Sequence, residues 1–302
     1  MTQFAFFFPG QGSQSVGMMS NFADLAVVKQ TFEQASDTLA VDFWSMVTES
    51  NDLLNLTQNT QPLMLTAGIA TWRAYQQFGG KMPAIMAGHS LGEYTALVAA
   101  DVISFEDALP LVKYRAEVMQ SAVPEGQGAM AAILGLADEV VIAVCQEAAN
   151  GAVLAAVNFN SPGQVVIAGE KNAVERAMEL AKDKGAKRAL ALPVSVPSHC
   201  ALMKPAADEL AQYLSSVARR LSQVRVLHNA DVVSYQEPAA IKDALVRQLY
   251  SPVRWVDTVQ AIHQEGVLNS AECGPGKVLA GLTKRIVAEV SCVALVSADA
   301  VR

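Results

Sequence analysis

The sequence predicts an α/β fold in which a parallel-sheet core is interrupted by a small inserted subdomain. Apolar runs of strand length alternate with helical segments in the first 124 residues and again from residue 194 onward. Such alternation is typical of a parallel sheet that helices cover on both faces. Between these parts the order changes to β-α-β-β-α-β, which is complete as a unit. We therefore expect a large subdomain of residues 1–124 and 194–302 and a small subdomain of residues 125–193.

The first expected strand is the apolar run Phe4–Phe8, which leads through Pro9 into a turn rich in glycine and glutamine. Residues 18–40 favour helix. Another helix is expected from Pro62 to Phe78, with proline in its first turn and two glycines after its end. The remaining elements before residue 124 are a strand over 83–87, a helix over 91–100, and a helix that begins at an N-cap Ser104 and runs to about residue 121.

The inserted segment has the ferredoxin-like order of elements. Its expected elements are strands over 129–136, 153–157, 164–168 and 188–192, with helices over 137–149 and 172–184. The pattern of the first part then resumes, with helices over 201–217, 238–249 and 256–264, a helix from Lys277, and strands over 224–227, 267–272 and 292–296. The resumed alternation indicates that both ends of the chain build one sheet.

Gly88-His89-Ser90-Leu91-Gly92 is a G-x-S-x-G pentapeptide between an expected strand and an expected helix. Its glycines allow a sharp turn that leaves the serine hydroxyl exposed at the tip. This geometry suits a nucleophile that attacks a carbonyl group. A plain turn is the alternative, but the flanking strand and helix favour a nucleophile. The core is therefore expected to be hydrolase-like.

A nucleophilic serine needs a base, and the sequence has four histidines. His89 adjoins the serine in a sharp turn, where neighbouring side chains diverge, and His228 ends a strand. His263 lies near a helix C-terminus, which favours histidine without any catalytic role. His199 follows a strand and two prolines, and loops at strand ends often hold catalytic groups. Spacing therefore favours His199 over His263 without excluding either.

An acyl-transfer site also needs donors for the oxyanion that forms during attack. The backbone N–H of Leu91 follows the nucleophile at the start of a helix and is one candidate. The Gly10-Gln11-Gly12 turn at the end of the first strand is a second, because its glycines permit close approach. The same turn nearly matches a dinucleotide fingerprint. The third glycine and the acidic residue that should end a second strand are both missing, which disfavours that alternative.

Arg115 shares the apolar face of its expected helix with Leu111, Val112, Val118 and Met119. One explanation is a side chain at the edge of the stripe with its charged head in water. The other is a cation held in a dry cleft to bind an anion through two hydrogen bonds. Beside a nucleophilic serine, the second explanation predicts an acyl substrate that carries a carboxylate.

Bulk composition excludes several classes of function. Of the 302 residues, 52% are hydrophobic, and the net charge of −7 disfavours nucleic acid and anionic membranes as partners. The four cysteines are widely spaced, so we do not expect a metal site. Their spacing fits a protein of a reducing compartment. We find no signal-peptide pattern and no apolar run long enough for a membrane span. The expected location is cytoplasmic.

Taken together, these motifs resemble the malonyl-CoA:acyl carrier protein transacylase family, and the resemblance extends over essentially the whole chain. Six strings in the family's order carry it: Pro9-Gly10-Gln11-Gly12-Ser13-Gln14, Gly88-His89-Ser90-Leu91-Gly92-Glu93, Tyr114-Arg115-Ala116, Asn160-Ser161-Pro162-Gly163-Gln164, Pro197-Ser198-His199 and Arg247-Gln248-Leu249. One such string is weak support, whereas six in order are specific.

The resemblance implies transfer of the malonyl group from malonyl-CoA to the phosphopantetheine thiol of acyl carrier protein, in the service of fatty acid synthesis. The route would be a ping-pong exchange through a malonyl-serine, with no metal and no bound cofactor. Holo acyl carrier protein and malonyl-CoA are the implied partners.

The resemblance also implies a role for each matching residue. Ser90 would be the nucleophile and His199 its general base, oriented by the backbone carbonyl of Gln248 where many such enzymes use an acid. The other implied roles are an oxyanion hole of the Gln11 and Leu91 N–H groups, a carboxylate site at Arg115, and a place in the substrate cleft for Asn160.

A basic cluster lies around the second helix and the last strand of the small subdomain. Because the carrier protein in such systems is acidic, we expect these residues to form a docking patch that raises the association rate. The alternative is an ordinary solvated face. The cluster consists of Lys182, Lys184, Lys187 and Arg188.

Two other classes of function compete with the transferase. An α/β-hydrolase-type thioesterase or esterase would use the same pentapeptide, would take His263 near the C-terminus as its base, and would give Arg115 no role. A carrier-protein-binding module with a dead site is the non-enzymatic alternative, which the intact serine, histidine and arginine set disfavours.

Overall fold

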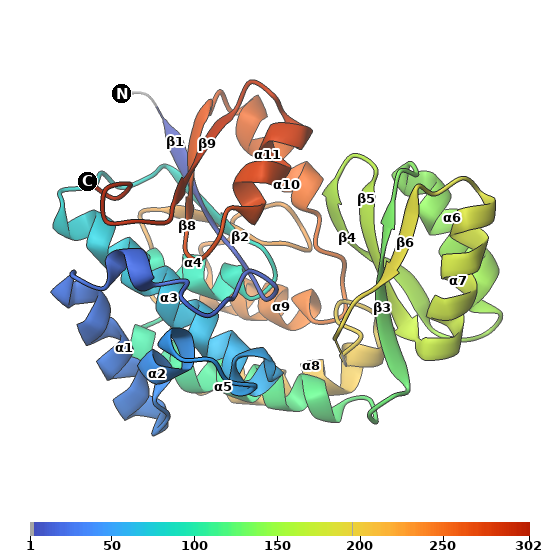
Figure 1. Ribbon diagram of the computed structural model, residues 1–302, viewed down its shortest axis with the longest axis horizontal. Helices are drawn as coiled ribbons and strands as arrows, with labels where there is room; N and C mark the ends of the chain where they lie inside the picture. Colours follow the sequence, from blue (N-terminus) through green and yellow to red (C-terminus); the bar gives the residue numbers. More distant parts are fainter. Residues whose placement is uncertain (1–2, 195) are drawn as a thin grey trace.

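The computed structural model describes residues 3–194 and 196–302, and these form two separate sheets (Figure 1). Within this part of the chain, a five-stranded parallel sheet has the order β7-β2-β1-β8-β9. A four-stranded antiparallel sheet has the order β4-β5-β3-β6. The expected combination of a parallel core and a ferredoxin-like antiparallel unit is confirmed.

The parallel sheet takes its strands from both ends of the sequence. Its strands are β1 (Phe4–Phe8), β2 (Ile85–Gly88), β7 (Arg225–Leu227), β8 (Asn269–Cys273) and β9 (Ser291–Leu295). Successive residues of β1 serve opposite faces. Phe6 and Phe8 pack in the cluster that contains α3 to α5, while Phe7 packs in the cluster that contains α10 and α11. A strand covered on both faces must be apolar throughout, which explains the unbroken apolar run.

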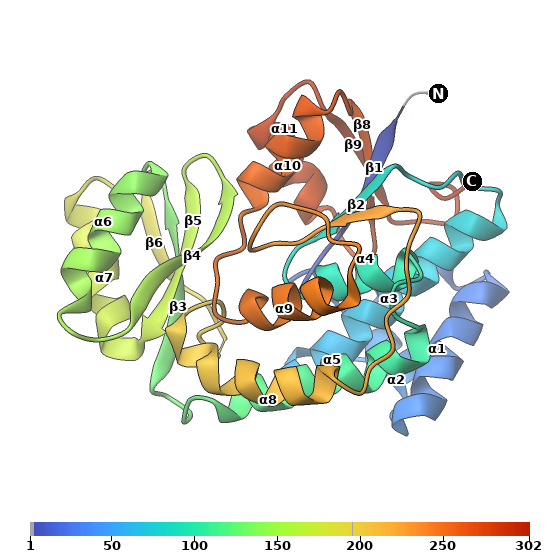
Figure 2. The same cartoon turned by 180° about the vertical axis from the view of Figure 1, so that it is seen from behind.

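Two helical layers cover this sheet (Figures 1 and 2). On one side lie α10 (Trp255–Gln264) and α11 (Val278–Ile286). The other helices of the large subdomain are α1 (Ala26–Leu39), α2 (Phe43–Thr48), α3 (Thr57–Gln77), α4 (Gly92–Ala99), α5 (Phe105–Ser121), α8 (Lys204–Leu214) and α9 (Pro238–Gln248), with 3-10 turns η1 (Ser20–Phe22), η2 (Leu53–Asn55) and η3 (Ala201–Met203).

The antiparallel unit packs two helices against one face of its sheet and turns the other face to the large subdomain (Figure 2). Its elements are β3 (Gly128–Leu134), α6 (Asp138–Ala149), β4 (Leu154–Ser161), β5 (Gln164–Glu170), α7 (Lys171–Asp183) and β6 (Arg188–Ala191). All of these elements lie inside the range 125–193 predicted for the small subdomain. The exact boundaries of the subdomain stay a prediction. The second face packs Met130 and Val166 with Cys200, beside His199.

Three boundary predictions are wrong by four residues or more. The helix expected over 18–40 is shorter, because α1 begins only at Ala26, after the 3-10 turn η1. Helix α3 begins at Thr57, so Pro62 lies in its second turn, where burial of nearly every side chain from Thr60 to Trp72 outweighs the lost backbone hydrogen bond. Strand β4 continues to Ser161, past the loop expected at Asn158. A backbone bridge between Asn158 and Val253 and pairing with β5 keep this polar segment extended.

Within the described residues, no helix combines the length and apolar character needed to cross a membrane.

Candidate active site

Ser90 occupies the tip of a turn between β2 and α4, with a left-handed backbone (φ +52°). A non-glycine residue adopts this conformation only at a cost in energy. Both flanking glycines are required by close contacts. A Cβ on Gly88 would lie 1.9 Å from the carbonyl carbon of Gly92, and a Cβ on Gly92 would lie 2.0 Å from the Phe8 oxygen. The turn therefore has the strained geometry that exposes a nucleophile.

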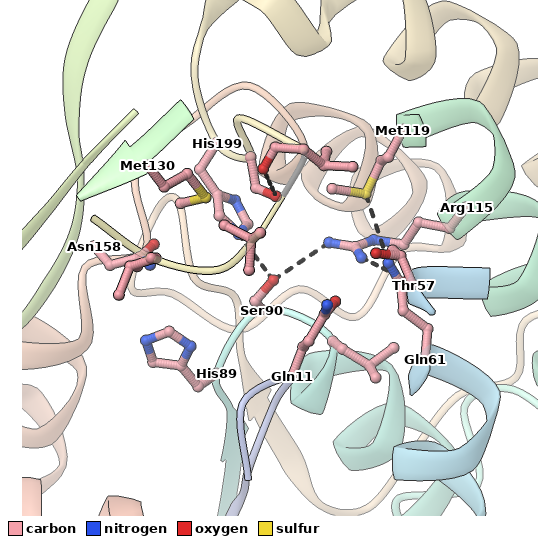
Figure 3. Close-up of a pocket in the computed structure, with 15 residues that line it drawn as sticks. Gln11, Thr57, Gln61, His89, Ser90, Arg115, Met119, Met130, Asn158 and His199 are labelled. Carbon is pink, nitrogen blue, oxygen red and sulfur yellow. Dashed lines mark hydrogen bonds between the residues drawn. The ribbon is translucent and has the colours of Figure 1, made fainter. Parts of the chain in front are cut away.

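The serine hydroxyl is 2.8 Å from Nε2 of His199 (Figure 3). Nδ1 of His199 is 2.8 Å from the backbone oxygen of Gln248. A carbonyl oxygen only accepts hydrogen bonds, so Nδ1 carries the proton and Nε2 can accept the serine proton. His199 also has a left-handed backbone (φ +66°), and its N–H donates to the Leu249 oxygen. The structure thus brings together Ser90, His199 and Gln248.

The protonation state of His199 suits a base. Burial in the site, followed by repulsion from the Arg115 guanidinium, lowers the pKa of His199 from 6.5 to about 3. The imidazole is therefore neutral at physiological pH and has a free lone pair for the serine proton.

The other three histidines do not contact the serine hydroxyl. Nε2 of His89 is 2.8 Å from Oδ1 of Asn160, and burial lowers the pKa of His89. Nδ1 of His228 is 2.7 Å from Oε1 of Glu93. His263 lies on α10 and is not part of the pocket wall around the serine. This arrangement does not support the base that the hydrolase alternative requires.

The side chain of Arg115 is buried beside the serine, with only 1% of the residue exposed. Its Nη1 donates to the Gln61 side-chain oxygen at 2.8 Å, and its Nη2 donates to that of Gln248 at 3.0 Å. Nη2 also lies 3.4 Å from Ser90 Oγ. These partners are neutral, and burial lowers the pKa of Arg115. A buried cation held by neutral groups is suited to an anionic ligand.

The pocket is lined by residues of both subdomains (Figure 3). Gln11 and Leu91 both line it, and Leu91 is the N-cap of α4. Gly10 permits this approach, since a Cβ there would lie 2.4 Å from the His89 oxygen. The antiparallel unit and the segment after it supply Met130, Asn158, Leu192 and Val194 to the wall. The serine therefore faces a cleft covered by the small subdomain.

Three sets of predicted site residues lie outside the pocket wall. Gln248 lies behind it, where it contacts His199 and Arg115. Asn160 accepts the hydrogen bond from His89, and the nearby Asn158 lines the pocket instead. The basic cluster is exposed at the end of α7, in the connection after it and at the start of β6. Lys182 pairs with Glu179 at 2.7 Å, and Lys184 pairs with Glu147 at 3.7 Å. Lys187 and Arg188 are also exposed.

Sequence reasoning missed three groups that contact the predicted residues: Gln61, Asn229, and the side chain of Gln248. Oδ1 of Asn229 accepts the Ser90 N–H at 2.7 Å. A signal for Asn229 was present, because it closely follows β7, the neighbour of β2 in the parallel sheet. The ends of parallel strands meet at one edge, where polar residues gather around a site.

Within the described residues, no group of three or more His, Cys, Asp or Glu side chains is arranged to hold a metal ion.

Comparison with known proteins finds one family of similar chains. The model of the acyl transferase domain family matches residues 5–297. Malonyl CoA-acyl carrier protein transacylases are 58% identical in Salmonella typhimurium, over 98% of this chain and 96% of the relative, and 44% identical in Bacillus subtilis, over 95% and 91%.

Solved structures are equally similar. An acyl-carrier-protein S-malonyltransferase from Burkholderia pseudomallei has a TM-score of 0.98 at 58% identity and covers 99% of this chain and 98% of its own. A malonyl-transacylase solved in complex with a type II PKS acyl-carrier protein has a TM-score of 0.98 at 54% identity, with the same coverage.

Proposed function

The chain belongs to the acyl transferase domain family, and we propose that it transfers the malonyl group of malonyl-CoA to the phosphopantetheine thiol of acyl carrier protein. The chain is an enzyme of malonyl transfer, and we propose that its product supplies fatty acid synthesis. One observation gives the main chemical support for this proposal. A buried guanidinium lies 3.4 Å from a serine hydroxyl that is hydrogen-bonded to a neutral imidazole.

In the first half-reaction, Ser90 Oγ attacks the thioester carbonyl of malonyl-CoA while His199 Nε2 takes its proton. The C–S bond then breaks, a C–O bond to the serine remains, and His199 returns the proton to the departing CoA sulfur. In the second half-reaction, the carrier-protein thiol gives its proton to His199 and attacks the malonyl ester. The proton then returns to Ser90 Oγ as the C–O bond breaks.

The negative charge that develops on the carbonyl oxygen needs donors. We assign these to the backbone N–H groups of Gln11 and Leu91. Their position on the pocket wall and the start of α4 at Leu91 support the assignment, since a helix N-terminus favours negative charge. No step is assigned to a bound cofactor, and malonyl-CoA enters only as a substrate.

Arg115 is assigned to the malonyl carboxylate. An acetyl group leaves the buried guanidinium without an anionic partner, so acetyl-CoA should be a poor substrate. Asn160 is assigned to a supporting position behind the covering wall of the cleft, where its bond to His89 joins β4 to the serine turn.

Acyl-CoA selectivity with holo carrier protein as acceptor tests this function. We expect Arg115→Ala to lower kcat/KM for malonyl-CoA by about 10²-fold or more, because the substrate carboxylate loses a buried charged partner. Acetyl transfer should change far less, since it does not use that partner. Equal losses for the two substrates would show that Arg115 has a structural role only.

We further propose that Lys182, Lys184, Lys187 and Arg188 guide the acidic carrier protein. All four are exposed, and β6 leads directly to Leu192 and Val194 on the pocket wall. Charge reversal by Lys187→Glu should raise the KM for carrier protein and weaken its salt dependence, since such charges act mainly on association. The exposed Lys29 on α1, at the other end of the molecule, gives a matched control as Lys29→Glu. Equal KM values and equal salt dependence for the two variants would exclude a docking role for the basic cluster.

A further inference from the structure

Both backbone polar groups of Ser90 are held by side chains from distant parts of the sequence. The Ser90 N–H donates to Oδ1 of Asn229 at 2.7 Å, and Nε2 of Gln248 donates to the Ser90 oxygen at 3.0 Å. The left-handed backbone of Ser90 persists only where its surroundings impose it. These two bonds act directly on that backbone.

Asn229 spans the serine turn. While its Oδ1 accepts from Ser90, its Nδ2 donates to the Gly88 oxygen at 2.6 Å. One planar amide thus joins the last residue of β2 to the residue at the tip of the turn. Asn229 is 1% exposed, so water cannot readily replace either bond.

Glu93 in turn holds the groups that hold Ser90. This carboxylate is fully buried in the first turn of α4 and accepts three hydrogen bonds. The donors are Nδ1 of His228 at 2.7 Å, the backbone N–H of Asn229 at 2.9 Å, and Nε2 of Gln248 at 2.8 Å. A buried carboxylate is tolerated only with such partners, so their geometry is tightly coupled to it.

Gln248 connects this arrangement to the rest of the site. Its side-chain oxygen accepts from Arg115, and its backbone oxygen accepts from His199. The three residues Glu93, Asn229 and Gln248, which we call the Glu93 clamp, therefore contact the serine backbone, the base and the carboxylate-binding cation at once.

We propose that Asn229, anchored by the buried Glu93, is a positioning residue that holds the Ser90 hydroxyl in its reactive orientation. This inference rests on the proposed acyl transfer. It has a consequence for the oxyanion, because the Ser90 N–H is already bonded to Asn229 and is not free to donate to the oxyanion. This agrees with the assignment of the oxyanion donors to Gln11 and Leu91.

The test measures Ser90 reactivity in two independent ways. Asn229→Ala should lower the kcat of malonyl transfer by about 10²-fold, because a displaced nucleophile loses its near-attack geometry. The rate of Ser90 modification by a neutral fluorophosphonate should fall to a similar extent, since this reagent does not need Arg115. Binding of malonyl-CoA, measured in the Ser90→Ala background, should stay close to that of Ser90→Ala alone.

Asn229→Asp provides a second variant if Asn229→Ala does not fold. One aspartate oxygen can still accept from Ser90, but the other can donate to the Gly88 oxygen only when it is protonated. Glu93 faces this position from α4, and His228 is the neighbouring residue; the buried carboxylate favours the protonated aspartic acid. The fluorophosphonate rate of Asn229→Asp, relative to the wild type, should therefore rise as pH is lowered from neutrality.

Asn51 supplies a matched control. Like Asn229 it joins backbone groups, accepting from Leu53 and Leu54 and donating to Met46 and Glu49, but it does not line the pocket. Asn51→Ala should leave both rates unchanged. The positioning role is overturned if folded Asn229→Ala reacts at wild-type rates, or if the pH profile of Asn229→Asp parallels the wild type. A wild-type enzyme that reacts with fluorophosphonate but not with malonyl-CoA would instead contradict the proposed function.

Discussion

At the scale of single residues, the charge of Arg115 and the basicity of His199 are coupled. Both side chains are buried beside Ser90, and the guanidinium disfavours a second positive charge on the imidazole. The base is therefore neutral before substrate arrives. A bound malonyl carboxylate would compensate the guanidinium and make His199 a stronger base in the complex.

This coupling predicts a shift in pH dependence. Protonation of His199 Nε2 removes the acceptor for the serine proton, so reactivity is lost as pH falls through the His199 pKa. Arg115→Ala removes the repulsion and raises that pKa, so the loss should occur at higher pH than in the wild type. The readout is the pH profile of Ser90 modification by a neutral fluorophosphonate.

Arg115→Lys retains the positive charge and serves as the control for this measurement. The pH at which Arg115→Lys loses reactivity on acidification should stay near that of the wild type. If Arg115→Ala and the wild type lose reactivity at the same pH, the coupling between Arg115 and His199 is excluded.

The pentapeptide predicted the serine turn, but residue types and order favoured His199 over His263 without excluding either. The family resemblance implied His199 and Gln248, and the structure brings both to Ser90. Gln61 escaped prediction because an amide side chain within a helix has no distinctive sequence pattern. Asn229 escaped because its place after β7 is informative only once β7 is known to be the neighbour of β2. Their positions follow only from the meeting of α3, β7 and the serine turn in space.

At the scale of elements, the strand–turn–helix unit depends on the absence of side chains at Gly88 and Gly92. The backbones of β1, β2 and α4 approach so closely there that any Cβ would overlap backbone atoms. Backbone atoms cannot move aside as flexible side chains do. The unit is therefore intolerant of substitution.

We predict that Gly88→Ala destabilises the fold by about 3 kcal/mol or more, because it overpacks a rigid backbone contact. Gly281, inside α11, is the matched control because a Cβ there meets nothing within 4 Å. Gly281→Ala should stabilise the fold by about 0.4–1 kcal/mol through reduced entropy of the unfolded chain. Urea unfolding of both variants measures the difference; similar effects in the two would contradict the packing argument.

The order and type of the larger elements could be predicted because hydrophobic periodicity reflects burial directly. The end of β4 could not be predicted, because Asn158 lines the cleft and Asn160 bonds to the serine turn, where strand residues would usually face an apolar core. A polar strand of this kind is indistinguishable from a loop in sequence.

At the scale of the whole molecule, the two subdomains are joined around the site. The Asn158–Val253 bridge connects their backbones, and His89 bonds to Asn160 across the junction. On the outer side, Arg285 of α11 donates to Gln164 at 2.8 Å. These links hold the antiparallel sheet over the serine, which limits water at the acyl-enzyme.

Loosening this junction should favour hydrolysis over transfer. Asn160→Ala leaves the buried His89 Nε2 without a partner and weakens the cover, so the malonyl-enzyme should hydrolyse severalfold faster. The measurement follows loss of the malonyl group without acceptor thiol. Asn172→Ala, at an exposed position of α7, should leave hydrolysis unchanged. Equal hydrolysis in both variants would exclude a sealing role for Asn160.

The central claim is that Ser90 carries the malonyl group between two thiols, and mass spectrometry tests it most directly. After brief incubation with malonyl-CoA, we predict a malonyl adduct on the peptide that contains Ser90, absent in Ser90→Ala and discharged by holo acyl carrier protein. An unmodified Ser90 peptide, or an adduct that holo carrier protein fails to discharge, would contradict the account.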